Sequence, residues 1–250
     1  MKAVFSDSYK NQQSKVEELI SNFSNNQGKL FGNGDRNTIK IFQLDHKQIN
    51  IKSFKEPNFI NRIAYKFFRK SKAERSFNYA EHLIAKGIGT PAPIAFAENN
   101  SSFLFKDSYY VSEHLPYDLT YRELVTNPNY PDHEKILRAF THFTYSLHEK
   151  KILFLDHSPG NTLIQINNGD YKFFLVDLNR MNFKKLSEQE RLKNFSRLTP
   201  KKEMVKIMAD EYSKLINKSS EDIFNKMWKY TVDFQNRIKR KHMLKSKFKP

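Results

Sequence analysis

ILFLDHSPGNTLIQINNGDYKFFLVDLNRM, residues 152–181, is the stretch that decides the fold. Its apolar start leads to Asp156 and, five positions later, to Asn161. Two short strands with a turn between them follow, and the second ends at Asp177. Phosphoryl transfer requires three such groups: an Asp that accepts the proton of the attacking hydroxyl, an Asn that holds one magnesium ion, and an Asp after a hairpin that holds the metal bridging the phosphates. The stretch therefore predicts a catalytic loop and a metal site.

The surroundings of these residues strengthen the prediction, since an Asp and an Asn five positions apart also occur by chance. Pro159-Gly160 preorganises the loop, and residues 173–176 (FFLV) read as a buried strand that ends on a carboxylate. A carboxylate at that place needs a partner, because an unpaired buried charge is costly. A metal ion is one such partner, and Arg180 is the structural alternative.

The half of the chain before this stretch predicts an antiparallel sheet with one helix. Alternating or β-branched runs indicate strands, and apolar residues at helical spacing before Gly87 indicate a helix with a glycine C-cap. The predicted elements are strands at 38–44, 48–54, 94–98 and 103–113 and a helix at 71–86.

After Pro116 the pattern is mainly helical, with predicted helices at 120–125, at 133–149 and in stretches from 187 to 241, and strands at 162–166 and 173–176. The fold class predicted is α+β and bilobal. A sheet-rich lobe extends to about residue 111, and a helical lobe starts at about residue 117. The domain boundaries are a polar extension at 1–28, a first lobe at 29–115 and a second lobe at 116–250.

Composition limits the function classes. The 250 residues contain no Cys, which excludes disulfides, thiolate metal sites and a cysteine nucleophile. The polar start and the lack of a long apolar run predict a cytoplasmic protein. The formal charge of +16 favours polyanionic partners and is concentrated at Lys66–Arg75 and Arg237–Lys249. Solvated helix faces are the alternative for either cluster.

Two segments carry a resemblance to a known family. LHEKKILFLDHSPGNTLI followed by FFLVDLNRMNF resembles the lipopolysaccharide kinases (Kdo/WaaP family) of Gram-negative bacteria, which phosphorylate Kdo or heptose in the inner core, and is most similar to the Bacteroidetes type. INIKSFKEPNFINRIAYKFFRKSKAERSFNYAEHLIAKGIGTPAPIAFAE resembles the first lobe of that family. The resemblance runs from about Gly32 to Phe195.

This resemblance implies a protein-kinase-like fold with ATP and Mg²⁺ as cofactors. It implies that Asp156 is the catalytic base, that Asn161 and Asp177 are metal ligands, and that Lys52 contacts the ATP phosphates. Lys55 is the competitor of Lys52. The two are an odd number of residues apart, so a regular strand points them to opposite faces and only one reaches the nucleotide.

Two further ATP-binding segments are predicted in the first lobe and at its end. Gly32 and Gly34 flank Asn33 where a phosphate-covering loop is expected, although Asn-Gly is also a common hairpin turn. Glu113, His114 and Leu115 fall where the backbone of the linker between lobes would hydrogen-bond adenine.

The chain also departs from the usual kinase pattern. The helix glutamate that should pair with Lys52 falls at Ser76 by the usual spacing, so Glu74 is the predicted partner and Glu81 its alternative. Phe154 stands where many kinases have His, and Leu178-Asn179 follow Asp177 in place of Phe-Gly.

Two histidines belong to the same region. His148, at the end of the long helix, matches a histidine that braces the catalytic loop in such folds. His157, beside Asp156, is either a contact for substrate phosphate or sugar, or a plain loop histidine.

The predicted function is transfer of phosphate from ATP to a Kdo or heptose hydroxyl of a lipid A-linked core. The predicted place of action is the inner face of the inner membrane, where an anionic surface attracts the basic chain. Nucleic acid is not an expected partner, and no obligate protein partner is expected. The alternatives are a kinase for another small molecule, such as an aminoglycoside-like sugar, and a catalytically silent kinase-like module that binds RNA or membrane.

Overall fold

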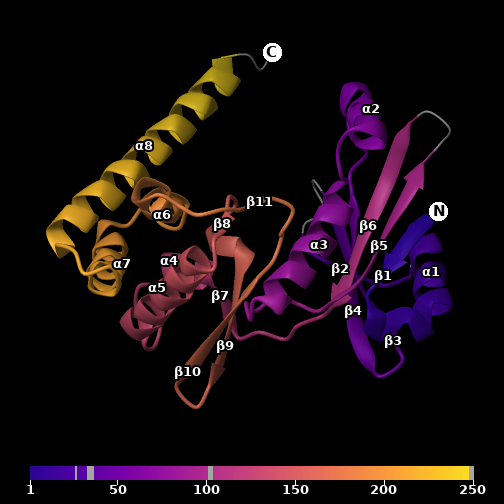
Figure 1. The fold of residues 1–250 in the computed structure, drawn as a ribbon, viewed down its shortest axis with the longest axis horizontal. Helices are drawn as coiled ribbons and strands as arrows, with labels where there is room; N and C mark the ends of the chain where they lie inside the picture. Colours follow the sequence, from indigo (N-terminus) through magenta and orange to yellow (C-terminus); the bar gives the residue numbers. More distant parts are fainter. Residues whose placement is uncertain (26, 33–36, 101–103, 248–250) are drawn as a thin grey trace. The chain divides into compact units, whose positions relative to one another are not determined.

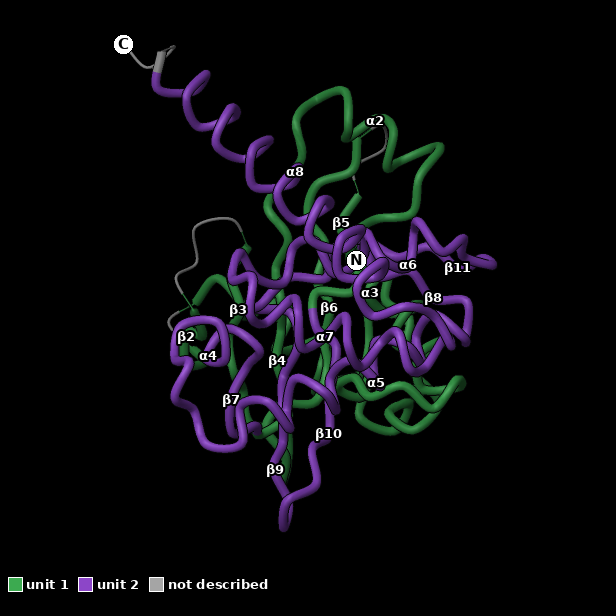
Figure 2. Tube along the Cα trace, turned by 90° about the vertical axis from the view of Figure 1, so that its left-hand side faces the viewer, with its two compact units in different colours: residues 1–116, 177–179 green, residues 117–176, 180–250 purple. Residues whose placement is uncertain are grey.

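The computed structural model describes residues 1–25, 27–32, 37–100 and 104–247. They form two compact units, shown in two colours in Figure 2. Unit 1 contains Met1–Pro116 together with Asp177–Asn179, and unit 2 contains Tyr117–Val176 and Arg180–Pro250.

Unit 1 is built on a six-stranded sheet in the order β1-β5-β6-β4-β3-β2, in which every neighbouring pair is antiparallel (Figure 1). The strands are β1 (Lys2–Phe5), β2 (Lys29–Phe31), β3 (Asn37–Leu44), β4 (Lys47–Phe54), β5 (Pro93–Asn100) and β6 (Phe105–Glu113). The helices are η1 (Asp7–Gln12), which is a 3-10 helix, α1 (Gln13–Ser21), α2 (Phe59–Phe67) and α3 (Lys72–Ala85).

Each face of this sheet carries its own apolar core, because successive strand residues point to opposite faces. Ile49 and Ile51 of β4 belong to the cluster that includes Val16 and Ile20 of α1. Phe54 of the same strand belongs instead to a second cluster with Ala73 and Phe77 of α3 and Phe96 of β5. The first 28 residues, predicted as a polar extension, therefore supply an edge strand and one core layer of unit 1.

Helix α3 begins and ends where local sequence signals place it. Its N-cap is Ser71, whose hydroxyl accepts a hydrogen bond of 3.0 Å from the N–H of Glu74. Beyond the C-cap, Gly87 has a φ of 65°, a left-handed conformation that glycine adopts without a Cβ clash. The predicted helix at 71–86 thus matches the observed one to within a residue at each end.

Unit 2 is mainly helical, with small sheets β10-β9-β7 and β11-β8. Its helices are α4 (Tyr121–Thr126), α5 (His133–Glu149), α6 (Glu188–Asn194), α7 (Lys202–Leu215) and α8 (Ser220–Lys247), with 3-10 helices η2 (Pro159–Asn161) and η3 (Phe195–Arg197). Its strands are β7 (Leu119–Thr120), β8 (Ile152–Phe154), β9 (Thr162–Asn167), β10 (Asp170–Leu175) and β11 (Met181–Phe183).

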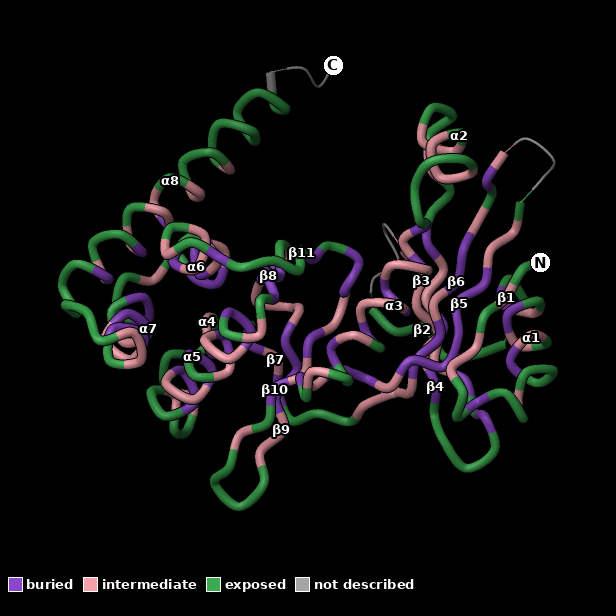
Figure 3. Tube along the Cα trace, viewed as in Figure 1, coloured by how far each residue is buried: buried purple, intermediate pink, exposed green. Residues whose placement is uncertain are grey.

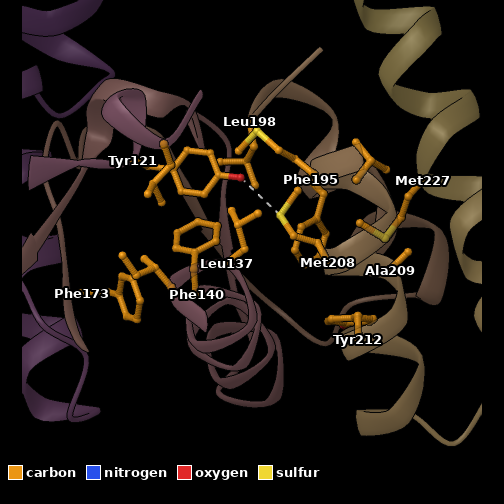
Figure 4. Close-up of a cluster of buried hydrophobic side chains, with 14 of the residues drawn as sticks. Tyr121, Leu137, Phe140, Phe173, Phe195, Leu198, Met208, Ala209, Tyr212 and Met227 are labelled. Atoms are coloured by element: carbon orange, nitrogen blue, oxygen red, sulfur yellow. Dashed lines mark hydrogen bonds between the residues drawn. The ribbon is translucent and has the colours of Figure 1, made fainter. Parts of the chain in front are cut away.

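The core of unit 2 lies where α5 and α7 meet the small sheet and α8 (Figure 4). Phe140 of α5 packs against Tyr121 with ring centroids 4.5 Å apart and against Phe173 of β10 at 5.6 Å. The hydroxyl of Tyr121 donates to the sulfur of Met208 at 3.4 Å. This core supports the loop between β8 and β9, which holds Asp156.

The observed elements confirm the predicted α+β class, with an antiparallel sheet first and helices second. The elements that were not predicted include β1, α2, β8 and β11. None of the helices in the described ranges combines the length and the apolar character that crossing a bilayer demands.

Candidate active site

Asp156 lies in the loop that β8 delivers from the core of unit 2. Its carboxylate is paired with Arg197 of η3, whose Nη2 lies 2.6 Å from Oδ1, and the Nη1 of Arg180 lies 3.8 Å from Oδ2. Arg197 also donates through Nη1 to the carbonyl of Leu155 at 2.9 Å. Arg197 therefore holds the predicted base, Asp156, through one carboxylate oxygen. Arg180, the alternative partner predicted for Asp177, lies near Asp156 instead.

Asn161 closes the loop that begins at Asp156. Its Nδ2 donates to the carbonyl of Asp156 at 2.8 Å, and its own N–H donates to the carbonyl of Ser158 at 2.9 Å. Its carbonyl accepts a hydrogen bond of 3.0 Å from the N–H of Val176, the residue before Asp177 in the sequence. The side chain of Asn161 is fixed through its Nδ2, so none of these hydrogen bonds uses its Oδ1.

A buried chain of hydrogen bonds braces the same loop. Burial lowers the pKa of His148 to about 4, although its contact with Asn194 works in the opposite direction, so the ring is neutral at pH 7. The ring nitrogens lie 2.8 Å from the Tyr212 hydroxyl and 3.2 Å from Asn194 Oδ1. Asn194 Nδ2 in turn donates to the carbonyl of Phe154 at 2.8 Å. The predicted bracing role of His148 thus operates through Asn194, which the sequence did not indicate.

His157 is fully buried and stacks on Phe140 with ring centroids 5.3 Å apart. Burial is the main cause that lowers its pKa to about 3, with smaller contributions from the neighbouring His148 and Arg197. Of the two alternatives for this residue, its burial favours the loop histidine over a substrate contact.

Lys52 and Asp177 meet within unit 1 although 125 positions separate them: Lys52 Nζ lies 2.7 Å from Asp177 Oδ1. Lys52 is on β4, on the same face as Phe54, and its ammonium lies 5.2 Å from the centre of that ring. Asp177 has a φ of 59°, an unfavourable value for a non-glycine residue. Its Oδ1 also accepts a bond of 2.7 Å from Asn179 Nδ2. Strain held by two polar contacts is typical of functional sites.

The competitors of these residues lie elsewhere. Lys55 is exposed beyond the end of β4. Glu74 of α3 pairs at 3.1 Å with Lys70, which precedes the helix, and Glu81 is exposed. Ser76 is buried, and its hydroxyl donates to the carbonyl of Lys72. The structure therefore brings Lys52 to Asp177 and neither helix glutamate to Lys52.

The segment predicted to bind adenine follows β6. The N–H of Glu113 donates to the carbonyl of Ala92 at 2.9 Å, and the N–H of His114 donates to the carbonyl of Gln48 at 2.8 Å. Both donors are thus used inside unit 1. Leu115 lies beyond these bonds and is half-buried.

The side chain of Glu113 is tied to the N-terminal segment. It accepts hydrogen bonds from Tyr9 of η1 and from Lys47, whose Nζ lies 2.5 Å away. Burial works to raise the pKa of Glu113, but the bonds from Lys47 and Tyr9 outweigh it and leave that pKa below its usual value. Glu113 is therefore ionised at neutral pH and is a structural ion-pair partner.

The predicted glycine loop is described only in part. Gly32 follows β2 with a φ of 80°, and a Cβ at this position would meet nothing within 4 Å. Gly34 lies outside the described residues.

Magnesium fits the donor set of the predicted ligands, because the ion prefers hard oxygens of the kind that amides and carboxylates supply. The hydrogen bonds described above leave Asn161 Oδ1 and Asp177 Oδ2 unused. Each of these oxygens is a donor of the kind that a magnesium ion binds.

Four contributors to this geometry escaped the sequence: Arg197, Asn194, Asn179 and Tyr9. Arg197 is one of many basic residues, and nothing in its neighbours singles it out. Asn179 follows Asp177 by two positions. An amide so close to a carboxylate was a signal from which their contact could have been predicted.

Comparisons with known proteins bear on the family and the fold of the chain. The model of the family described as "Lipopolysaccharide kinase (Kdo/WaaP) family" matches residues 22–218. No curated protein is significantly similar to the chain. The solved structure "WaaP in complex with acyl carrier protein" is similar with a TM-score of 0.64 at 13% identity, covering 96% of this chain and 99% of that one.

A MAP kinase from Leishmania major has a TM-score of 0.48 at 16% identity, covering 88% of this chain and 66% of that one, a likeness too distant to carry weight. The resemblance to WaaP confirms the predicted protein-kinase-like fold. The family match extends over most of both units and confirms the predicted family. This chain belongs to the lipopolysaccharide kinase (Kdo/WaaP) family.

Proposed function

We propose that this chain is an ATP- and Mg²⁺-dependent kinase that phosphorylates a Kdo or heptose hydroxyl of the lipopolysaccharide inner core. Membership of a lipopolysaccharide kinase family supports a phosphotransferase in general. The observation that carries the proposal is the pair of Lys52 Nζ and Asp177 Oδ1 at 2.7 Å. It brings together the strand lysine, proposed to contact the phosphates, and the carboxylate after the hairpin, proposed to hold the metal.

In the proposed reaction Asp156 orients the sugar hydroxyl and accepts its proton. The hydroxyl oxygen forms a bond to the γ-phosphorus, the bond from that phosphorus to the bridging oxygen breaks, and ADP leaves. Magnesium, when bound, would neutralise charge on the phosphates. Lys52 adds a fixed positive charge, and Asn161 and Asp177 would hold the metal. Positioning and electrostatics together supply the rate enhancement.

The side chains that hold these groups support the roles. Asp156 is bound by Arg197 through Oδ1, so Oδ2 is the oxygen we assign to proton transfer. Val176 is hydrogen-bonded to Asn161, and Asp177 follows it directly, so a single peptide unit links the two proposed metal ligands. For adenine we assign the N–H of Leu115, because those of Glu113 and His114 already bond to Ala92 and Gln48.

Partners and place of action follow from the proposed acceptor. A kinase that acts on a lipid A-linked sugar must work at the inner face of the inner membrane. We propose that this chain binds there peripherally. Its charge of +16 supports attraction to anionic lipid. In the similar solved structure, WaaP is in complex with acyl carrier protein. For this chain such a partner remains a proposal.

The test of the proposal is phosphate transfer by the Asp156→Asn variant. Because the variant keeps the shape of the side chain and loses the base, kcat should fall by a factor of about 100 to 10,000 while ATP affinity changes little. The assay is magnesium-dependent transfer of labelled phosphate from ATP to Kdo-lipid A, with the product weighed by mass spectrometry.

Asp170→Asn is the matched control, since Asp170 is an exposed carboxylate in the same unit. Full activity of Asp156→Asn would refute the base assignment. Transfer by the wild type to soluble aminoglycosides or sugars alone would favour a small-molecule kinase. Tight RNA binding without ATP turnover would favour a silent module.

A further inference from the structure

Helix α2 lies with its polar side against the sheet of unit 1. Arg62 donates through Nε to the carbonyl of Phe105 at 2.9 Å, and its Nη2 pairs with Glu56 at 3.1 Å. The ring of Tyr65 packs on the ring of Phe105 with centroids 5.6 Å apart. These contacts fix which side of the helix faces the protein.

The apolar side of α2 therefore faces away from the sheet. Phe59, Ile60, Ile63 and Phe67 share one side at helical spacing and are 63%, 77%, 37% and 58% exposed. Figure 3 shows that α2 contains exposed residues. Phe68, at the C-cap, is 82% exposed. A helix on the surface of a globular unit normally buries its apolar side and exposes its polar side. The reversed arrangement in α2 indicates that a partner covers this side, since large apolar side chains gathered at one exposed place mark interaction sites.

The charge around this helix defines the partner. Between Glu56 and Glu74 the sequence contains no acidic residue and five basic ones. Arg62 and Lys70 pair with Glu56 and Glu74, so Lys66 and Arg69 carry the charge argument. Lys66 and Arg69 belong to the last turn and the residues just after it, beside the exposed Phe67 and Phe68. Apolar side chains flanked by basic ones match an anionic lipid surface, in which acyl chains take the former and headgroup phosphates the latter.

We propose that α2 is the segment by which this protein lies on an anionic bilayer, with Phe59, Ile60, Ile63, Phe67 and Phe68 inserted between lipid headgroups. The helix has 9 residues, too few to span a bilayer but enough to lie in its surface. Its N-cap Asn58 accepts a bond of 3.0 Å from the N–H of Asn61, so the helix is preformed and binding need not order it. The reason for this membrane contact rests on the proposed function, in which the acceptor is linked to a lipid. The outward orientation of the apolar side of α2 does not depend on that function.

The first test is flotation with vesicles, without ATP. The wild type is mixed with vesicles of phosphatidylcholine alone or of phosphatidylcholine with phosphatidylglycerol, and the bound fraction is measured. The double variant Ile60→Ser, Phe67→Ser should bind the anionic vesicles at least about tenfold more weakly, because it removes two large inserting side chains.

The matched control is Met243→Ser, Leu244→Ser in the basic end of α8, where the side chains are 57% and 58% exposed. It should bind like the wild type. Arg69→Glu should weaken binding to the anionic vesicles and not to the neutral ones. If the α8 variant loses binding while the α2 variant keeps it, the inference is overturned.

The second test uses the absence of Cys from the sequence, which makes any introduced cysteine a unique label site. Phe67→Cys and the exposed hairpin variant Asn167→Cys are labelled with a nitrobenzoxadiazole dye. Anionic vesicles should shift the emission to the blue at position 67 and leave it unchanged at 167. A blue shift at 67 that needs no vesicles and grows with protein concentration would mean that a second copy covers the face, and would overturn the inference.

These experiments distinguish a failure of the proposed function from a failure of the α2 inference. Vesicle binding through α2 by a protein that transfers no phosphate would refute the kinase proposal alone. Phosphate transfer by a protein whose α2 variants still bind vesicles normally would refute the α2 inference alone. Equal melting temperatures of all variants, measured by circular dichroism, exclude unfolding as the cause.

Discussion

Asp156 illustrates how a single side chain is prepared by neighbours that the sequence does not reveal. Arg197 binds Oδ1 at 2.6 Å, while Arg180 lies 3.8 Å from Oδ2 with its side chain 61% exposed. The first contact restrains the carboxylate, and the second is long and solvated, so it is weak. Arg197 is therefore a positioning residue for the proposed base.

Arg197→Met should lower kcat for phosphate transfer by about tenfold or more with little change in KM for ATP, because a misplaced base slows the chemical step without touching the nucleotide. Methionine keeps much of the apolar stem and removes the guanidinium, whose carbon lies 5.6 Å from the centre of the Phe234 ring. Steady-state kinetics at varied ATP concentration checks the split.

Arg180→Met is the matched control, and we expect a loss of less than about threefold, since its contact is long and exposed. A larger loss in Arg180→Met than in Arg197→Met would contradict the assignment.

The helices and strands differ in how well the sequence predicted them. Helix α3 carries its own signals, a serine N-cap and a glycine beyond its end, and α5 was predicted at its observed bounds, His133–Glu149. Strand β1 carries no such signal, because its place in the sheet depends on pairing with β5, 90 or more positions away in the sequence. Local patterns cannot report a partner that only the fold supplies.

The 3-10 helix η1 gives an element-scale prediction. Tyr9→Phe should lower the free energy of unfolding by about 1–2 kcal/mol, because it removes the hydroxyl that donates to the ionised Glu113 and leaves the ring in the core. Urea unfolding followed by circular dichroism measures the change.

Asp7→Ala in the same element is the control. Its pair with Lys10 is exposed, with side-chain exposures of 94% and 65% respectively, so its removal should leave the free energy of unfolding nearly unchanged. Equal effects of the two changes would refute a bracing role for Tyr9.

For the whole molecule, the two buried histidines of unit 2 set an expected pH dependence. The folded-state pKa values of about 4 for His148 and about 3 for His157 lie below the usual 6.5. The unfolded chain therefore binds more protons below pH 6.5. Their stabilisation is fully present above that pH and decreases as the pH falls toward the folded-state values, by up to about 1.4 kcal/mol per pH unit for each histidine.

His157→Leu should reduce this slope between pH 6.5 and 4.5 by up to half, since one of the two groups no longer titrates. Urea unfolding at several pH values provides the measurement. The exposed His242 serves as control, because His242→Leu should leave the slope as in the wild type. An unchanged slope in His157→Leu would show that this histidine is not protonated on unfolding in that range.

The sequence by itself determined the α+β class, the family and the elements with local signals. Hydrophobic periodicity, caps and the order of Asp156, Asn161 and Asp177 are all properties of nearby residues. The roles of these three residues and of Gly32, Gly34, Glu74, Glu113, His114 and Leu115 stay predictions until the variants are measured.

Only the tertiary structure decided which distant side chains meet. It paired Lys52 with Asp177 across 125 positions, joined Arg197 to Asp156 and turned the apolar side of α2 outward. The physical reason is that an ion pair or a buried face depends on distances in space, which the folded backbone fixes, whereas a sequence pattern records only the order of residues along the chain.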